Sequence, residues 1–208
     1  MQLVIGNKNY SSWSLRAWLA LKVLGVPFEE LRIPLYEPAS KAAILRHSPS
    51  GKVPCLIDGE TAVWDSLAIL EYLAESHPQL WPAQRPERAR ARALAAEMHS
   101  GFPNLRQHMS MNIRKRHPGK GRTPEVLAEI ERIAAVWSAA RRPFLFGEFG
   151  AVDAMYAPVA LRFRTYEVDL PRDAQAYADA LLSLEPLREW IAGAERETES
   201  IPAFEQYG

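Results

Sequence analysis

Ser50-Gly51-Lys52-Val53-Pro54-Cys55-Leu56-Ile57-Asp58-Gly59 is the stretch of the chain that decides its fold. The Gly-Lys pair indicates a turn, and the following Val53-Pro54 pair predicts a strand that begins with a proline. This strand ends at the Asp-Gly pair, which supplies the positive φ that a tight hairpin turn needs. Downstream of the hairpin, Asp65 precedes an apolar helical pattern and is therefore predicted to cap a helix.

The same region predicts a binding site for a small anionic peptide. Because proline has no N–H, the backbone of Val53 can face a peptide ligand in place of a neighbouring strand. We expect the Val53-Pro54 bond to be cis, since only a kinked bond turns the Val53 backbone towards the ligand. The N-terminus of the helix after Asp65 suits a carboxylate.

Composition excludes several classes of protein. The chain has 208 residues, of which 48% are hydrophobic, so a sizeable core in one large or two small domains is expected. Lys+Arg and Asp+Glu both number 25, which argues against a nucleic-acid-binding protein. The single cysteine excludes a disulfide framework, and the histidines lack the spacing of metal ligands. Neither a signal peptide nor a stretch of membrane-spanning length is visible, so we expect a cytoplasmic protein without membrane, nucleic-acid or metal partners.

Hydrophobic periodicity divides the chain into an α/β part and a helical part. Strands are predicted around residues 3–5, 28–33, 53–58 and 61–64, with helices around 15–24, 39–47 and 65–76. Further helices are predicted at 86–115 (interrupted at Gly101 and Pro103), 123–140, 152–167, 173–183 and 184–196. We therefore expect one domain at 1–78, a linker at 79–85, a second domain at 86–198, and a tail at 199–208 with Phe204 and Tyr207 as candidate anchors.

Three motifs, in this order along the chain, resemble those of the cytosolic glutathione transferases. The segment Tyr10-Ser11-Ser12-Trp13-Ser14-Leu15-Arg16 is similar to the serine motif at the first helix of zeta-like and tau-like members. Val53-Pro54 and Asp65-Ser66 are similar to the cis-proline and the acidic-serine pair of the glutathione site. Phe146-Gly147 through Asp153 is similar to the capping segment of the helical domain. The chain thus resembles a serine-type, bacterial-type member over nearly its whole length.

This resemblance implies a thioredoxin-like α/β domain, an all-α domain, and glutathione as the co-substrate. It also implies that Lys52 reaches the glycine carboxylate, that Val53 and Pro54 present backbone to the peptide, and that Asp65 and Ser66 hold the γ-glutamyl group. The implied activity is conjugation of the glutathione thiolate to small hydrophobic electrophiles, in detoxification, by a homodimer. Glutathione-dependent peroxide reduction, isomerisation at the same site, and a non-catalytic glutathione-binding or regulatory protein stay open as alternatives.

Ser11 and Ser12 are the candidate catalytic residues, because they lie where the first strand meets the first helix. A thiol has an ordinary pKa of ~8.5, and a helix N-terminus with a hydroxyl donor lowers it by favouring the thiolate. Spacing from Arg16 places Ser11 at the catalytic position of serine-type members, with Ser12 as the second candidate; both are alternatively simple helix caps. Tyr10 is a rival hydroxyl. Trp13 stands where zeta-like members have a cysteine, which argues against their isomerase chemistry.

Two other residues are predicted to be structural. Cys55 is interpreted as a small core residue. Asp153 is predicted to be buried and to accept the backbone N–H of Gly150, which stands where the family has a hydroxyl-bearing cap. If Gly150 is an ordinary cap, its replacement by serine is expected to be neutral or slightly stabilising, unless its φ is positive.

Overall fold

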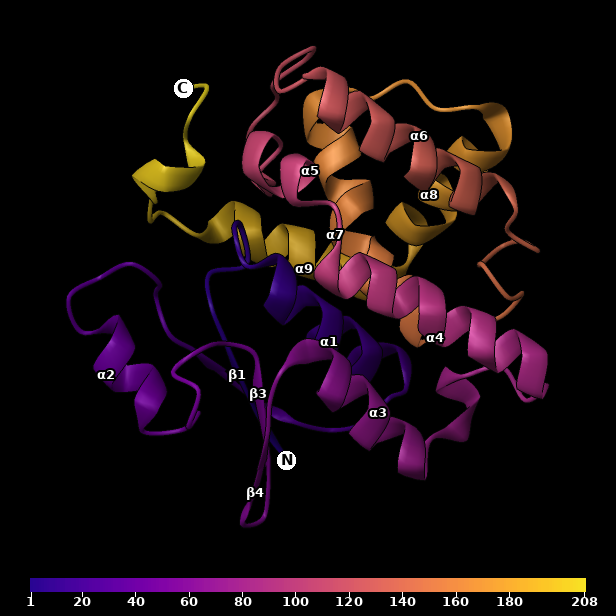
Figure 1. Cartoon of the computed structure of the whole chain (residues 1–208). Helices are drawn as coiled ribbons and strands as arrows, with labels where there is room; N and C mark the ends of the chain where they lie inside the picture. The colour runs from indigo at the N-terminus through magenta and orange to yellow at the C-terminus, as the bar shows by residue number, and fades with distance from the viewer.

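The first part of the chain is a four-stranded sheet with its helices. The structure is a computed structural model that describes every residue, Met1–Gly208. The strand order is β2-β1-β3-β4, and Figure 1 labels β1, β3 and β4. The central strand β1 (Gln2–Ile5) pairs in parallel with β2 (Glu29–Arg32) and antiparallel with β3 (Cys55–Asp58), which forms the predicted hairpin with β4 (Thr61–Val63). The α/β class predicted for this part is confirmed.

Three helices accompany the sheet. They are α1 (Ser12–Val23), α2 (Ser40–Leu45) and α3 (Ser66–Ser76). Helix α1 connects the parallel strands β1 and β2, and it contacts both α3 and the later helix α7. Every residue of α1 from Ser14 to Leu21 is buried, because the helix is enclosed between the sheet part and the helical part. Asp65 caps α3 as predicted, since its carboxylate accepts from the N–H groups of Leu67 (3.0 Å) and Ala68 (3.4 Å).

The second part is all-helical, as predicted, and follows a short 3₁₀ turn, η1 (Pro78–Leu80). Its helices are α4 (Arg85–Ser100), α5 (Pro103–His108), α6 (Pro124–Ser138), α7 (Ala151–Tyr166), α8 (Arg172–Ser183) and α9 (Glu185–Arg196). Helix α7 is the central one and packs against α1, α4 and α8 (Figure 1). The main core runs from Leu3 in the sheet to Trp137 and Trp190 in the helices, and a small second cluster in the sheet part contains Val4 and Cys55. The domain boundaries stay a prediction.

The predicted helix at 86–115 is correctly interrupted after Ser100, but it ends earlier than expected, at His108. Residues 109–123 contain no helix because elements distant in sequence bind their backbone. The N–H of Arg114 donates to the side chain of Asn9 (2.9 Å), and the N–H of His117 donates to the carbonyl of Thr165 (2.7 Å). Tertiary hydrogen bonds thus replace the helical ones.

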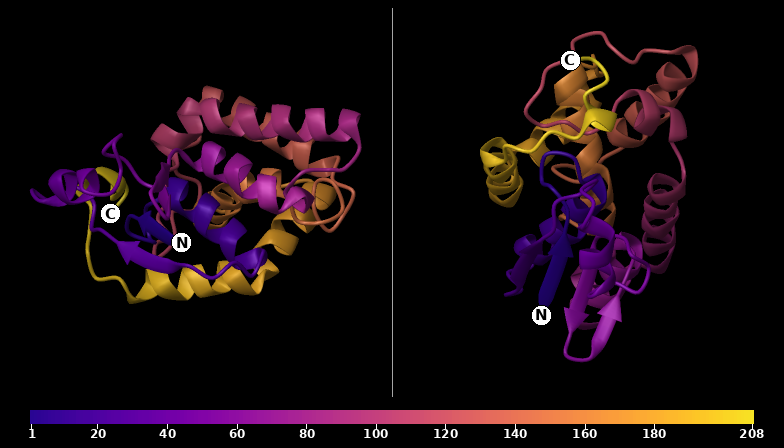
Figure 2. Two further views of the ribbon diagram at one scale, coloured as in Figure 1. Left: turned by 90° about the horizontal axis from the view of Figure 1, so that it is seen from below. Right: turned by 90° about the vertical axis from the view of Figure 1, so that its left-hand side faces the viewer.

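The C-terminal segment returns to the sheet part of the molecule (Figure 2). The short turn η2 (Pro202–Phe204) places the ring of Phe204 on that of Tyr10, with ring centroids 5.6 Å apart. The hydroxyl of Tyr207 donates to the carbonyl of His108 (2.9 Å). Both aromatic side chains anticipated as anchors therefore make contacts.

Asp153 organises the start of α7. Its carboxylate accepts from the N–H groups of Gly150 (2.8 Å) and Leu145 (3.1 Å) and from the hydroxyl of Tyr177 (2.8 Å). Asp153 is completely buried, and this burial raises its pKa to about 6. The prediction that Asp153 is a buried residue that binds the N–H of Gly150 is confirmed.

Replacement of Gly150 by alanine or serine is expected to destabilise the protein, contrary to the expectation from sequence. The φ of Gly150 is −134°, which any residue adopts, but a Cβ atom there would lie 2.8 Å from the carbonyl oxygen of Leu80. Because that neighbour is backbone, the overlap forces a main-chain shift that costs about 1–3 kcal/mol. Chemical denaturation of Gly150→Ala and of the parent measures the difference in their free energies of unfolding. Gly25→Ala, at a φ of +67° with open space around it, isolates the cost of φ alone. A Gly150→Ala protein as stable as its parent would contradict the prediction.

Candidate functional site

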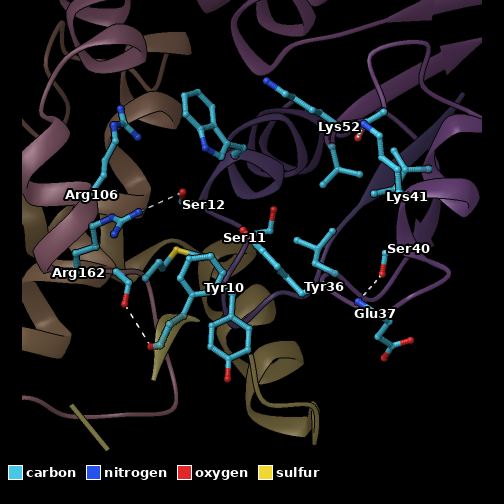
Figure 3. Close-up of a pocket in the computed structure, with 18 residues that line it drawn as sticks. Tyr10, Ser11, Ser12, Tyr36, Glu37, Ser40, Lys41, Lys52, Arg106 and Arg162 are labelled. Atoms are coloured by element: carbon cyan, nitrogen blue, oxygen red, sulfur yellow. Dashed lines mark hydrogen bonds between the residues drawn. The ribbon is translucent and has the colours of Figure 1, made fainter. Parts of the chain in front are cut away.

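A pocket of about 520 Å³ lies where the sheet part meets the helical part. Figure 3 shows Ser11 and Ser12 near its centre, Lys41 and Lys52 on one side, and Arg106 and Arg162 on the other. The serines come from the start of α1, the lysines from α2 and the turn before β3, and the arginines from α5 and α7. Of the residues predicted from sequence, Ser11, Ser12, Lys52 and Val53 are therefore brought together in one cavity.

Ser11 is the N-cap of α1. Its side-chain oxygen accepts from the N–H of Ser14 (3.4 Å), and its hydroxyl donates to the side-chain oxygen of Ser14 (2.7 Å). The oxygen of Ser14 also accepts from the N–H of Gly6 (3.1 Å), which fixes the junction between β1 and α1. The hydroxyl proton of Ser11 is thus already engaged within the helix cap.

Ser12 has a different environment. Its side-chain oxygen accepts from the guanidinium of Arg162 (3.3 Å), a bond between residues 150 positions apart in the sequence. The hydroxyl proton of Ser12 donates to no protein acceptor in the structure. Both serines line the pocket and are only about 5–6% exposed, so each faces the cavity more than the bulk solvent. Of the two serines, only Ser12 has a hydroxyl proton that is free to donate into the pocket.

Tyr10, the rival hydroxyl, is bound to the C-terminal segment. Its hydroxyl donates to the carboxylate of Glu205 and accepts from the guanidinium of Arg114 (3.1 Å) and from the N–H of Ile201 (3.4 Å). Because this oxygen is occupied on all sides, Tyr10 contributes its ring to the pocket wall and not its hydroxyl.

The turn before β3 forms the opposite wall. The Val53-Pro54 bond is cis, as predicted. Lys52 and Val53 line the pocket, while Pro54 is buried behind them. Lys41, which the sequence did not single out, donates to the carbonyl of Gly51 (3.2 Å) and adds a second ammonium group to this end. Cys55 is buried in β3, in agreement with its interpretation as a core residue.

Asp65 and Ser66 are not among the residues that line the pocket. Asp65 is exposed and pairs with the side chain of His99 (3.1 Å), whose ring in turn meets the edge of Trp13 in the pocket wall, with centroids 5.3 Å apart. Ser66 is completely buried, and its side-chain oxygen has no partner. The start of α3 is therefore linked to the pocket through Trp13 and His99 but is not part of the same cavity.

Three arginines surround the first turn of α1, and two of them line the pocket. The guanidinium of Arg106 donates to the carbonyls of Gly101 and Met98, and that of Arg162 to the carbonyl of Met109. Burial, and then the charge of Arg106, lowers the pKa of Arg162 to about 9. Burial is also the main cause that lowers the pKa of Arg16, followed by its two arginine neighbours.

Arg106 and Arg162 were not predicted as site residues from the sequence, and Arg16 served there only to number the spacing of the serines. The available signal was the position of Arg162, a charged residue inside the apolar run of α7, where fourteen of its fifteen neighbours in the helix are buried. A charged residue in such a helix is unusual unless it has a partner or a function.

The structure contains no helix that is both long enough and apolar enough to span a membrane.

Comparison with known proteins gives two family matches. Residues 10–76 match the family described as "Glutathione S-transferase, N-terminal domain", and residues 114–193 match "Glutathione S-transferase, C-terminal domain". A relative from Caenorhabditis elegans, described as a probable maleylacetoacetate isomerase, is 36% identical over 96 residues, which are 45% of this chain and 44% of that protein. The chain spans about half the length, or less, of the first curated relatives that it matches.

Two solved structures have the same fold. A glutathione transferase homologue from Burkholderia with bound glutathione superposes with a TM-score of 0.72 at 22% identity, over 94% of this chain and 98% of its own. A bacterial maleyl pyruvate isomerase, described as a zeta-class glutathione S-transferase, gives a TM-score of 0.73 at 23% identity, over 96% and 100%. At this level of identity the likeness concerns the fold.

Proposed function

The chain belongs to the glutathione S-transferase family, and from that premise we propose that its pocket binds glutathione and presents the glutathione thiolate to a small electrophile. The observation that carries this proposal is the convergence of Ser11, Ser12 and Val53 on one cavity beside the start of α1. A helix N-terminus stabilises an anion, and a hydroxyl donor there favours a thiolate over a thiol.

The ends of the tripeptide have chemically suitable partners. Lys41 and Lys52 supply two ammonium groups for the glycine carboxylate at one end of the pocket. The backbone of Val53 beside the cis-proline is suited to pair with the cysteinyl unit in the manner of an added strand. The buried, unpartnered hydroxyl of Ser66, at the first turn of α3, is suited to the γ-glutamyl carboxylate, and Asp65 to its ammonium.

Removal of the groups at the start of α3 is expected to weaken glutathione binding. Asp65→Asn keeps the helix cap but removes the charge, and Ser66→Ala removes the hydroxyl; each should cost about 1–3 kcal/mol of binding free energy, because a charged partner is left unpaired. Calorimetric titration with glutathione measures the change. Ser76→Ala, an exposed serine at the other end of the same helix, is the matched control. Unchanged affinity in both variants would place the γ-glutamyl site elsewhere.

Isomerisation of an unsaturated acid is the second candidate function. Two relatives with similar sequence or fold are described as maleylacetoacetate and maleyl pyruvate isomerases. The specific observation that favours it is the pair of cations, Arg106 and Arg162, on the helical side of the pocket, where they could bind the carboxylates of such a substrate. The presence of Trp13, in place of the cysteine of zeta-like members, argues against it.

Retention on immobilised glutathione, followed by assays with three substrate classes, tests these functions. Turnover of a neutral chloroaromatic electrophile supports conjugation, turnover of a cis-unsaturated keto acid supports isomerisation, and turnover of an organic hydroperoxide supports peroxide reduction. Retention without turnover of any of these supports a binding or regulatory protein. Failure to bind glutathione in solution contradicts the proposal as a whole.

We also propose the remaining expectations from the resemblance: a cytoplasmic homodimer with a role in detoxification, and a division into domains at 1–78 and 86–198. Analytical ultracentrifugation measures the oligomeric state, and limited proteolysis at 79–85 tests the division.

A further inference from the structure

The first turn of α1 is surrounded by positive charge that no carboxylate pairs with directly; Asp65 and Glu129 act on Arg16 and Arg106 only from beyond ion-pair distance. Arg16, Arg106 and Arg162 all approach Ser12, and none of the three forms an ion pair with an aspartate or glutamate. Their partners are backbone carbonyls, one serine hydroxyl and the ring of Trp13, whose centroid lies 4.3 Å from Arg16 and 5.0 Å from Arg106. Buried cations are costly unless an anion compensates them.

Arg16 is the least satisfied of the three. It is 1% exposed, and its Nε and Nη1 atoms have no hydrogen-bond partner. It borders a small cavity of about 10 Å³ beneath the pocket, together with Ser12, Arg106 and Arg162. Unpartnered buried donors of this kind raise the electrostatic potential on the side of α1 that Ser12 occupies.

Arg162 connects this charge to the pocket through a single hydrogen bond. One guanidinium nitrogen is fixed on the carbonyl of Met109, and the other donates to the oxygen of Ser12 (3.3 Å; Figure 3). Because this oxygen accepts from Arg162, the hydroxyl of Ser12 is left to donate its own proton into the pocket. Ser11 differs in that its proton is given to Ser14.

We propose that Arg162 is the positioning residue for thiol activation: it orients Ser12 so that the Ser12 hydroxyl donates to the glutathione sulfur, and its charge helps to stabilise the thiolate. This inference rests on the proposed function and deepens it. In the step concerned, the S–H bond breaks, its proton leaves to the buffer, and sulfur keeps the electron pair. The sulfur anion is then the directly adjacent counter-charge that no carboxylate of the protein supplies to these arginines.

The experiment compares the pKa of the thiol of bound glutathione, measured by the ultraviolet absorbance of the thiolate, among single variants. Arg162→Gln is expected to raise this pKa by about one unit or more, which is about a tenfold loss of thiolate at neutral pH. Arg162→Lys keeps the charge, so the thiol pKa in this variant should lie between those of the parent and of Arg162→Gln. Arg164→Gln removes the same charge two residues along α7, where no contact with Ser12 or the pocket exists, and should behave as the parent.

Further measurements distinguish a role of Arg162 in positioning Ser12 from a role in folding or in binding glutathione. Glutathione affinity at a pH where the thiol is protonated should change less than about threefold in Arg162→Gln. If Arg162→Gln does not fold, two other variants carry the test. Ser12→Ala, with Arg162 intact, must raise the pKa of the bound thiol, and Arg162→Lys must raise it by a smaller amount. In a Ser12→Ala background, Arg162→Lys should have little additional effect, since both act through one hydrogen bond.

The inference is overturned if Arg162→Gln and Arg164→Gln give the same thiol pKa. It is also overturned if Ser11→Ala, and not Ser12→Ala, raises that pKa. An unchanged thiol pKa combined with weaker inhibition by maleate would assign Arg162 to the second substrate instead. A parent protein that does not bind glutathione overturns the proposed function and this inference together, whereas binding with a thiol pKa independent of Arg162 overturns the inference alone.

Discussion

Ser12→Ala is expected to lower turnover with glutathione at least about tenfold at neutral pH, since one hydrogen-bond donor to a reacting anion contributes roughly 2–4 kcal/mol. The affinity for glutathione should be nearly unchanged, because the hydroxyl acts on the sulfur and the ends of the tripeptide bind elsewhere. Steady-state kinetics with a chloroaromatic substrate, together with calorimetry, measures both quantities.

Ser11→Ala is the control variant that shows which of the two serines activates the thiol. Spacing along the sequence favours Ser11 as the thiol activator, but its hydrogen bonds to Ser14 support the role of a helix cap. We therefore expect Ser11→Ala to lower the free energy of unfolding by about 0.5–2 kcal/mol and to lower turnover less than Ser12→Ala does. The opposite order of the two turnover losses would return the catalytic role to Ser11.

Asp153→Ala is expected to give the largest loss of stability, about 3–5 kcal/mol, because the N–H groups of Leu145 and Gly150 and the hydroxyl of Tyr177 would be left unpaired in the core. Urea denaturation measures the loss. The fraction that remains folded should keep its glutathione affinity, since Asp153 lies outside the pocket. A variant that unfolds like the parent but has lost turnover would show that Asp153 acts in the chemistry.

The same carboxylate gives a prediction about pH. Because its pKa in the folded protein is raised from 3.8 to about 6, it binds a proton more readily folded than unfolded. The protonated carboxyl therefore contributes roughly 3 kcal/mol to the free energy of unfolding. This contribution is fully present below the unfolded-state pKa of 3.8 and is lost as the pH rises through about 6. The parent and Asp153→Asn should thus differ in the slope of unfolding free energy between about pH 4 and pH 6.5. Parallel pH profiles of the two proteins would contradict the raised pKa.

The parts of the fold that were predictable depend on local signals. The hairpin at Asp58-Gly59 and the cap at Asp65 each follow from a few adjacent residues whose backbone preferences are strong. The cis bond at Val53-Pro54 was predicted from the need to turn the Val53 backbone towards a peptide ligand, because X-Pro bonds alone are cis in only about 5–6% of cases. The helices after residue 85 follow from periodicity and from the turns between them. These signals act within one element, so a single sequence contains them.

The parts that were not predictable depend on contacts between distant segments. The helix that begins after Gly101 ends at His108 because Asn9 and Thr165 bind the backbone that follows. Gly150 is restricted by the carbonyl of Leu80, which lies on a different element. The link between Ser12 and Arg162 joins α1 to α7 and has no counterpart in local sequence.

A pH titration of the thiol in the complex of the unmodified protein with glutathione, followed by the ultraviolet absorbance of the thiolate, directly tests whether this pocket activates the glutathione thiol. We expect that glutathione binds and that the pKa of its thiol lies about one unit or more below the ordinary value of ~8.5. A bound thiol that ionises at the value of free glutathione, or a protein that does not bind glutathione, would contradict it.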